Sequence, residues 1–237
     1  MLTEEFKGFP YCGINMHEII YFSSPGRAES SRLCLELSGI SWKNTIVSWE
    51  EYMELKQQDE LPWGLLPIIR TSQGTVAESA ALLRYTGALA GLEPEDLFLR
   101  AKVDETLDLM RGWWGVFTPT FSIDKIEEKI SARQKLFEEG EPMDMAMKQL
   151  SKMCSESKLG WIAGTQSMSI ADVKAFTDTF MLFSGQFDGL DPSIIRKYPE
   201  LLIFHEKISN IPEIKLYYSD IEDRKEHWVF QPGAFNN

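Results

Sequence analysis

The segment from Trp63 to Ser79, WGLLPIIRTSQGTVAES, constrains the fold of this chain more than any other. Because proline cannot donate a hydrogen bond to a sheet, Pro67 belongs at the very start of a strand. A cis bond between Leu66 and Pro67 can be accommodated there, and it would turn the chain sharply. The main-chain N–H and C=O groups of Leu66 would then be open to an extended peptide ligand.

The end of the same segment predicts a second binding group. Glu78-Ser79 places an acid and a hydroxyl at the start of a helical pattern. The first N–H groups of a helix have no partner inside the helix, and they favour a carboxylate. Together with the Leu66-Pro67 corner, this indicates a receptor for a small peptide that carries both a free amine and a free carboxylate.

Composition limits the classes of function. The net charge of −12 over 237 residues argues against binding of nucleic acid or of anionic membrane surfaces. Cys12, Cys34 and Cys154 lie far apart without a CxxC motif, which indicates a reducing compartment and no metal site. No apolar run approaches about 18 residues, and the N-terminus lacks a signal-peptide pattern. We therefore expect a cytoplasmic protein without a metal.

The first part of the chain alternates strand and helix patterns. After a loose extension over residues 1–13, we expect one domain over residues 14–91. Strands are predicted at 17–22, 45–47, 68–70 and 75–77, and helices at 27–37, 49–56 and 79–89. This β-α-β-α-β-β-α order is typical of a thioredoxin-like α/β domain.

Residues 94–225 are predicted to form an all-helical domain. Apolar residues recur with a helical period at 94–117, 123–139, 142–157, from 169 onward, at 199–209 and at 212–218. Ser169 and Asp172 form a capping box that starts one buried helix. The linker is short and acidic, so the two domains should pack closely. The aromatic C-terminal tail, HWVFQPGAFNN, could fold over a pocket or cover core.

Four motifs occur in order across both domains: YFSSPGRAESSRL at 21–33, LPWGLLPII at 61–69, ESAALLRY at 78–85 and GWIAGTQSMSIAD at 160–172. Their combination resembles the cytosolic glutathione transferases, nearest the tyrosine-type mu, pi and sigma classes, with sigma-like the closest. The resemblance implies an N-terminal thioredoxin-like domain that binds glutathione as a co-substrate, followed by an all-helical domain that forms the hydrophobic-substrate site. It implies no metal.

The resemblance assigns the sulfur of glutathione to Tyr21, at the end of the first strand. A free thiol has a pKa of about 8.5, and a hydrogen bond donated to the thiolate lowers that pKa. Tyr21 would therefore be the catalytic residue as a donor to the thiolate, and it would not act as a base. Ser23 or Ser24 in the following loop could supply the same donor, as in other classes of the family.

The rest of glutathione maps onto the two groups described first. By the resemblance, Leu66 and Pro67 would pair with the cysteinyl unit. Glu78 would attract the γ-glutamyl ammonium group, and Ser79 would hold its carboxylate.

The glycyl carboxylate of glutathione needs donors from the second helical segment. Trp49 and Lys56 are the candidates, and Tyr52 or Gln58 could replace either of them. Arg27 either tunes the sulfur site or pairs with an acid such as Glu29.

Two positions depart from the family pattern. Where the family has an Asp that reaches the glutathione amine of the other subunit, this chain has Gly112, with Asp108 and Asp104 one and two turns earlier. Where a basic or polar residue often precedes the corner, this chain has Leu65. Both departures would weaken glutathione binding without abolishing it.

The electrophile site is expected between Tyr21 and the first long helix. Its aromatic candidates are Trp113, Trp114, Phe117 and Phe121, of which at least two should instead be interhelical core. Trp63 occupies the place from which relatives insert an aromatic residue into the partner, so we expect a C2 homodimer.

The function predicted is a glutathione transferase that conjugates glutathione to hydrophobic electrophiles. One alternative is a glutathione-dependent isomerase or peroxidase of lipid-like substrates. Another is a non-catalytic binding or structural module of the same fold. A glutaredoxin-like oxidoreductase is disfavoured because no cysteine follows the first strand.

Overall fold

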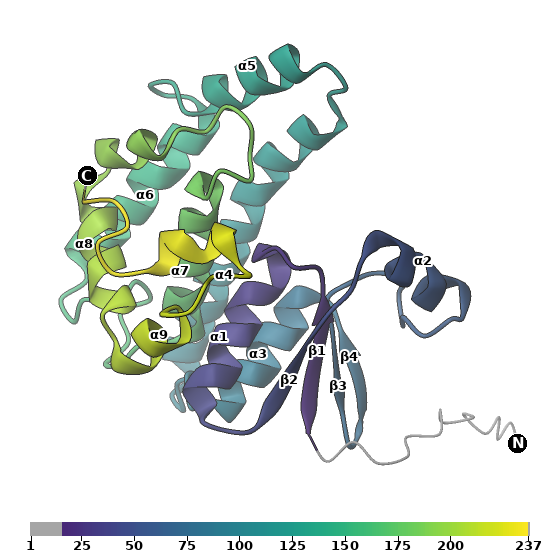
Figure 1. Cartoon of the computed structure of the whole chain (residues 1–237). Helices are drawn as coiled ribbons and strands as arrows, with labels where there is room; N and C mark the ends of the chain where they lie inside the picture. The colour runs from purple at the N-terminus through teal and green to yellow at the C-terminus, as the bar shows by residue number, and fades with distance from the viewer. Residues whose placement is uncertain (1–15, 237) are drawn as a thin grey trace, which may run out of the picture.

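The computed structural model describes residues 16–236. The predicted extension over residues 1–13 lies outside this range. The chain forms a small mixed sheet with three helices, followed by a larger helical body that packs against one side of it (Figure 1). This is the thioredoxin-like plus all-helical architecture expected from the sequence. In the part described, no helix is long and apolar enough to cross a membrane.

The sheet has the strand order β2-β1-β3-β4. The strands are β1 (His17–Tyr21), β2 (Trp42–Ile46), β3 (Ile68–Thr71) and β4 (Gly74–Ala77). β1 is parallel to β2 and antiparallel to β3, and β3 and β4 form the predicted hairpin. The prediction of the second strand at 45–47 was wrong at its start. The strand begins at Trp42 because residues 42–46 pair in register with β1, although the exposed Lys43 is not typical of a strand.

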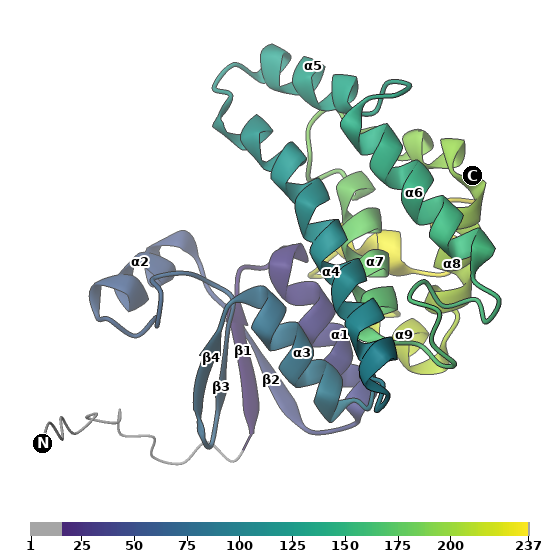
Figure 2. The same cartoon turned by 180° about the vertical axis from the view of Figure 1, so that it is seen from behind.

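Three helices complete the first domain: α1 (Glu29–Ser38), α2 (Trp49–Gln57) and α3 (Ser79–Leu89). α1 and α3 pack together on the side of the sheet that faces the helical body, whereas α2 lies on the opposite side (Figures 1 and 2). α1 starts two residues later than predicted because residues 26–28 form a short 3-10 turn. It ends before Gly39, as predicted.

The helical body contains α4 (Leu97–Phe117), α5 (Ile126–Leu136), α6 (Pro142–Glu156), α7 (Ile170–Phe180), α8 (Pro199–Ser209) and α9 (Pro212–Tyr217). The buried helix α7 contacts α1, α3, α4 and α8. Its start is held by Asp172, whose carboxylate accepts from the N–H and hydroxyl of Ser169, both at 2.9 Å. Burial raises the pKa of Asp172 although these bonds oppose that change.

The two parts of the chain are packed tightly, as the short linker predicted. The hydroxyls of Ser30 on α1 and Thr177 on α7 lie 2.7 Å apart. Gly87 on α3 allows α7 to approach closely, because an added Cβ would collide with Ile170. The tail covers core: the side chain of Phe230 is fully buried. We propose residues 14–91 and 94–225 as the domain limits.

Candidate active site

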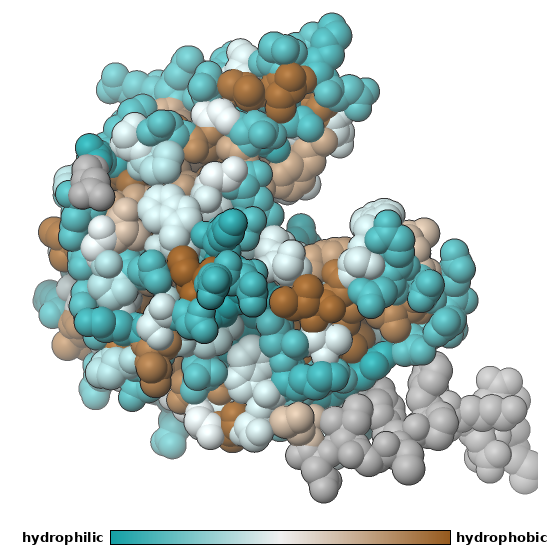
Figure 3. Space-filling view, viewed as in Figure 1, coloured by the Kyte–Doolittle hydropathy of each residue, from teal (hydrophilic) through white to brown (hydrophobic). Residues whose placement is uncertain are grey.

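A cleft of about 500 Å³ lies between the sheet and the helical body. Figure 3 shows the molecule hollowed between its upper helical part and the part that carries α2. The first domain contributes residues from β1, the following loop and the start of α3, and the helical body contributes residues from α4 and α7. The polar and aromatic lining residues are Tyr21, Ser24, Arg27, Glu78, Ser79, Arg84, Asp108, Arg111, Trp114, Thr118, Phe121, Lys174, Asp178, Gln186 and Phe187.

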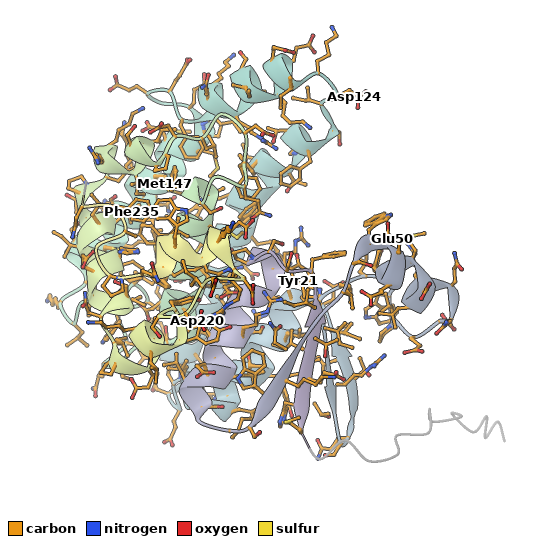
Figure 4. The ribbon with its side chains drawn as sticks, in the orientation of Figure 1. Tyr21, Glu50, Asp124, Met147, Asp220 and Phe235 are labelled. Atoms are coloured by element: carbon orange, nitrogen blue, oxygen red, sulfur yellow. The ribbon has the colours of Figure 1, made fainter. Side chains whose placement is uncertain are left out.

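Tyr21 lies at the end of β1 that borders this cleft (Figure 4). Its side chain is 9% exposed, and its hydroxyl oxygen accepts a hydrogen bond from the main-chain N–H of Arg27 at 3.2 Å. Because this bond uses the oxygen as an acceptor, the hydroxyl proton is free to be donated. The ring is held from behind by the guanidinium of Arg32, whose Cζ lies 5.6 Å from the ring centroid.

Gly26 is a site residue that the sequence analysis did not identify. Its φ of +45° suits glycine, and a Cβ built there would lie 2.6 Å from the Tyr21 hydroxyl oxygen. Only glycine therefore lets the loop pass over the tyrosine. The Pro25-Gly26 dipeptide was the available signal, since it marks a turn directly after the strand.

The serines after β1 occupy different places. Ser24 is half-buried and lines the cleft, whereas Ser23 is exposed and does not. The main-chain carbonyl of Ser24 accepts from Arg32 at 3.0 Å, so the loop is fixed at this point. Ser24 is thus the alternative donor that the geometry favours over Ser23.

Arg27 lines the cleft with an exposed side chain. The alternative pairing with Glu29 is wrong, because Glu29 is fully buried and its carboxylate bonds Arg32, Tyr218 and His227. Within residues 16–236, the Arg27 guanidinium forms no ion pair. It is therefore available to an anionic group of a ligand.

The bond between Leu66 and Pro67 is cis, as the sequence analysis anticipated. Pro67 is buried directly before β3, and Leu66 is half-buried against the core of the sheet. Among the described residues, no group hydrogen-bonds the main-chain N–H or C=O of Leu66. These two groups can therefore pair with an extended ligand, although neither residue is part of the cavity lining.

Glu78 and Ser79 meet at the start of α3, and both line the cleft. Glu78 has a φ of +71°, a conformation that costs a non-glycine residue about 1–3 kcal/mol and that is concentrated at ligand sites. This backbone turn places Ser79 at the first position of the helix, beside the unpaired N–H groups. The pair therefore offers a negative charge and an anion-binding helix start side by side.

The residues predicted on α2 are not part of the cavity lining. Trp49 stacks on Phe22 with ring centroids 6.4 Å apart, and its side chain is 63% exposed. The ammonium of Lys56 lies 5.8 Å from the ring centroid of Tyr52. Tyr52 donates its hydroxyl to the Gly64 carbonyl at 2.9 Å, so this alternative donor is occupied within the protein. Gln58, the other alternative, caps the end of α2 and is exposed.

The helical body forms one wall of the cleft, called here the helical wall. As expected, only some of the four aromatic candidates lie on it, and the others are packed between helices. Trp114 and Phe121 line the cleft, whereas Phe117 is fully buried core and Trp113 borders a separate small cavity. The sequence analysis did not identify Arg111, Lys174 and Asp178 of this wall as site residues. Arg111 pairs with Asp108 at 3.3 Å and Lys174 with Asp178 at 2.6 Å, and Arg84 of α3 pairs with Asp104 of α4 at 2.7 Å.

The acids near the departure at Gly112 are engaged within their own chain. Asp104 and Asp108 pair with Arg84 and Arg111, and a Cβ at Gly112 would have open space around it. Leu65, at the second departure, is 55% exposed. In the part of the chain that the structure covers, no cluster of His, Cys, Asp or Glu could hold a metal ion.

The two described cysteines, Cys34 and Cys154, are protonated at neutral pH and lie outside the cleft lining. Burial raises the pKa of the Cys34 and Cys154 thiols to about 12, and neither residue lines the cleft.

Comparisons with known proteins show which sequences and folds this chain is similar to. Residues 116–220 match the family described as "Glutathione S-transferase, C-terminal domain". Glutathione S-transferase 4 of Caenorhabditis elegans is 27% identical over 87% of this chain and 97% of its own length. Glutathione S-transferase 1 of Ascaris suum is 24% identical over 86% and 96%. The fold is similar to prostaglandin synthase D of Nilaparvata lugens, with a TM-score of 0.75 and 19% identity over 85% of this chain and 96% of that one.

Proposed function

Because this chain belongs to the glutathione S-transferase family, we propose that it binds glutathione in the cleft and stabilises the glutathione thiolate with the Tyr21 hydroxyl. The observation that carries the proposal is the position of that hydroxyl. Its oxygen accepts from the Arg27 N–H, so its proton can be donated into the cleft. A donor to the thiolate lowers the thiol pKa and raises the fraction of nucleophile at neutral pH.

The remaining contacts follow the extended shape of a tripeptide. The free N–H and C=O of Leu66, beside Pro67, pair with the cysteinyl unit. Ser79 and the start of α3 hold the γ-glutamyl carboxylate, and Glu78 binds the ammonium group. Trp49 and Lys56 of α2 are proposed as donors to the glycyl carboxylate of glutathione. Arg27 is proposed to attract an anionic group of the ligand.

The second substrate binds against the helical wall. Trp114 and Phe121 supply apolar surface there, so the proposed reaction adds the thiolate to a hydrophobic electrophile held beside Tyr21. The protein provides proximity and a preorganised donor, with glutathione as the co-substrate.

The decisive measurement is a pH titration of the thiolate ultraviolet absorbance of glutathione bound to the wild type, Tyr21→Phe and Ser24→Ala. We expect a thiol pKa below the free value in the wild type and in Ser24→Ala, and a return toward the free value in Tyr21→Phe. A return only in Ser24→Ala would move the donor to Ser24. No glutathione binding by the wild type would leave the chain as a non-catalytic module of this fold.

A second candidate is a glutathione-dependent isomerase or peroxidase of lipid-like acids. The charged helical wall favours it, because Arg111 and Lys174 lie beside apolar surface and suit a substrate with an apolar body and an anionic end. The structurally similar protein of Nilaparvata lugens is a prostaglandin synthase. Product analysis with an unsaturated fatty-acid hydroperoxide and glutathione separates reduction or isomerisation from conjugation.

The proposed assembly is a cytoplasmic C2 homodimer. Trp63 and Leu65 are 70% and 55% exposed at the corner that precedes β3, and they form an apolar projection that a partner could cover. Light scattering of the wild type and Trp63→Ala tests this: a dimer that becomes monomeric in the variant supports it, and a monomeric wild type contradicts it.

A further inference from the structure

A buried polar cluster connects the C-terminal segment, residues 218–231, to the loop after β1. Its centre is Glu29, the first residue of α1, which is fully buried. One carboxylate oxygen accepts from the Tyr218 hydroxyl at 2.8 Å. The other lies 3.1 Å from Nη1 of Arg32 and 3.3 Å from Nε2 of His227. Two of its three partners therefore come from residues 189 and 198 positions later in the sequence.

Arg32 links this cluster to the place where Tyr21 would meet the glutathione thiol, which we call the thiol site. Its guanidinium donates to the main-chain carbonyls of Phe22 at 2.9 Å and Ser24 at 3.0 Å, on either side of Ser23. Nε donates to the Asn44 side chain on β2 at 3.0 Å. The same guanidinium lies over the Tyr21 ring. Because Arg32 is 2% exposed, water cannot replace these bonds without a rearrangement of the loop.

The C-terminal segment is itself held in place. His227 has Nδ1 3.2 Å from the Arg224 carbonyl, so both of its ring nitrogens face groups that can only accept. The Tyr218 and Phe230 rings lie 4.9 Å apart, and Gln231 donates to the Tyr218 carbonyl at 2.7 Å. In Figure 1 this yellow segment folds back across the helical body toward the first residues of α1.

We propose that His227 and Tyr218 are positioning residues of the thiol site. They fix Glu29, Glu29 fixes Arg32, and Arg32 fixes the 22–24 loop and the Tyr21 ring. The C-terminal segment thereby sets where the Tyr21 hydroxyl is presented, although it does not line the cleft. The influence of His227 and Tyr218 on catalysis rests on the proposed function. Their influence on the position of the 22–24 loop does not depend on it.

The test compares His227→Gln and Tyr218→Phe with His205→Gln. His205 also holds the C-terminal segment, through the Val229 carbonyl at 2.7 Å, but it does not contact Glu29. It is therefore a matched control for general loosening of the segment. Tyr218→Phe removes one hydroxyl only and keeps the test valid if His227→Gln fails to fold.

The first readout is amide hydrogen exchange of residues 22–29 in the unliganded protein. We expect exchange about tenfold faster in His227→Gln and Tyr218→Phe, which corresponds to about 1.4 kcal/mol of easier local opening. His205→Gln should leave this segment unchanged. Wild-type exchange of residues 22–29 in folded Tyr218→Phe would overturn the proposal, as would equally fast exchange in the His205 control.

The second readout is the thiol pKa of bound glutathione in the same variants. A positioning role predicts a rise of this pKa toward the free value, together with a lower kcat and little change in the KM for glutathione. A loss of stability alone would lower the apparent kcat by reducing the folded fraction, but it would leave the pKa of the bound thiol unchanged. An unchanged thiol pKa would overturn the catalytic part. If the wild type binds no glutathione, the proposed function fails, and hydrogen exchange still decides whether the segment positions the loop.

Discussion

The two walls of the cleft are built in different ways. The wall of the first domain depends on main-chain geometry, namely the positive φ of Glu78 and the close passage of Gly26 over Tyr21. The helical wall depends on side chains that pair across its surface, such as Arg111 with Asp108. Main-chain geometry tolerates few substitutions, whereas an exposed ion pair can be exchanged at little cost in stability.

This difference indicates that each wall of the cleft suits a different ligand. The first wall is suited to one invariant ligand, for which we propose glutathione. The second wall is suited to a substrate that can change as its side chains change. Variants of the two walls should therefore have separable effects on the two substrates.

The largest expected effect on stability concerns Glu29, whose carboxylate holds Arg32 behind the first wall. Burial opposes its charged form, but His227, Arg32 and Tyr218 outweigh burial and lower its pKa from 4.5 to about 2. A carboxyl with a lowered folded-state pKa stabilises the fold above its unfolded pKa, and this stabilisation is lost as the pH falls toward 2. Between about pH 6 and 3, the free energy of unfolding of the wild type should fall ~2 kcal/mol more than that of Glu29→Gln.

Urea denaturation at the two pH values measures this difference. Equal losses in the wild type and Glu29→Gln would show that the carboxylate is not held as the structure indicates.

The next effect is that of Gly26→Ala on the presentation of Tyr21. The added methyl group would meet the hydroxyl at 2.6 Å in a backbone conformation unfavourable to alanine, so the tyrosine must move. We expect kcat/KM for conjugation to fall about 100-fold, comparable to the loss of a preorganised donor. Steady-state kinetics measures it.

Gly112→Ala, on α4 and outside the cavity lining, is the matched control. Nothing lies within 4 Å of its added methyl group, so activity should be kept and stability should rise by up to about 1 kcal/mol. A fully active Gly26→Ala variant would show that this loop does not set the tyrosine position.

A smaller effect is expected for Ser79→Ala, which removes one donor from the first wall. The KM for glutathione should rise about tenfold, while the KM for the electrophile stays constant. Ser79→Thr retains the hydroxyl and should remain close to the wild type. A change in the electrophile KM instead would break the assignment of the two walls.

The smallest effect is expected for Arg111→Gln on the second wall. Its side chain is 75% exposed in the pair with Asp108, so stability should change by no more than about 0.5 kcal/mol. The KM should rise about threefold for an electrophile that carries a carboxylate and remain unchanged for a neutral one. If only the KM for glutathione increased, Arg111 would belong to the glutathione site instead.

Local patterns in the sequence predicted much of this protein. The Leu66-Pro67 corner, the hairpin of residues 68–77 and the helix starting at Ser79 follow from turn, proline and capping chemistry within a few residues of each other. The helix start at Ser169 and Asp172 follows for the same reason. The second strand was misplaced because its polar residues are made into a strand by pairing with β1, which is a nonlocal contact.

Tertiary structure alone decided three features of the site. The Glu29–His227 contact joins residues far apart in the chain, and no local pattern could reveal it. The charged helical wall arises because α4 and α7 face the same cleft. The closeness of Gly26 to the Tyr21 hydroxyl depends on how the loop folds back over the strand. Short-range chemistry therefore determined most of the elements and the start of α3 in the first wall. Packing between distant segments determined the extent of β2, what supports Tyr21 and what faces it.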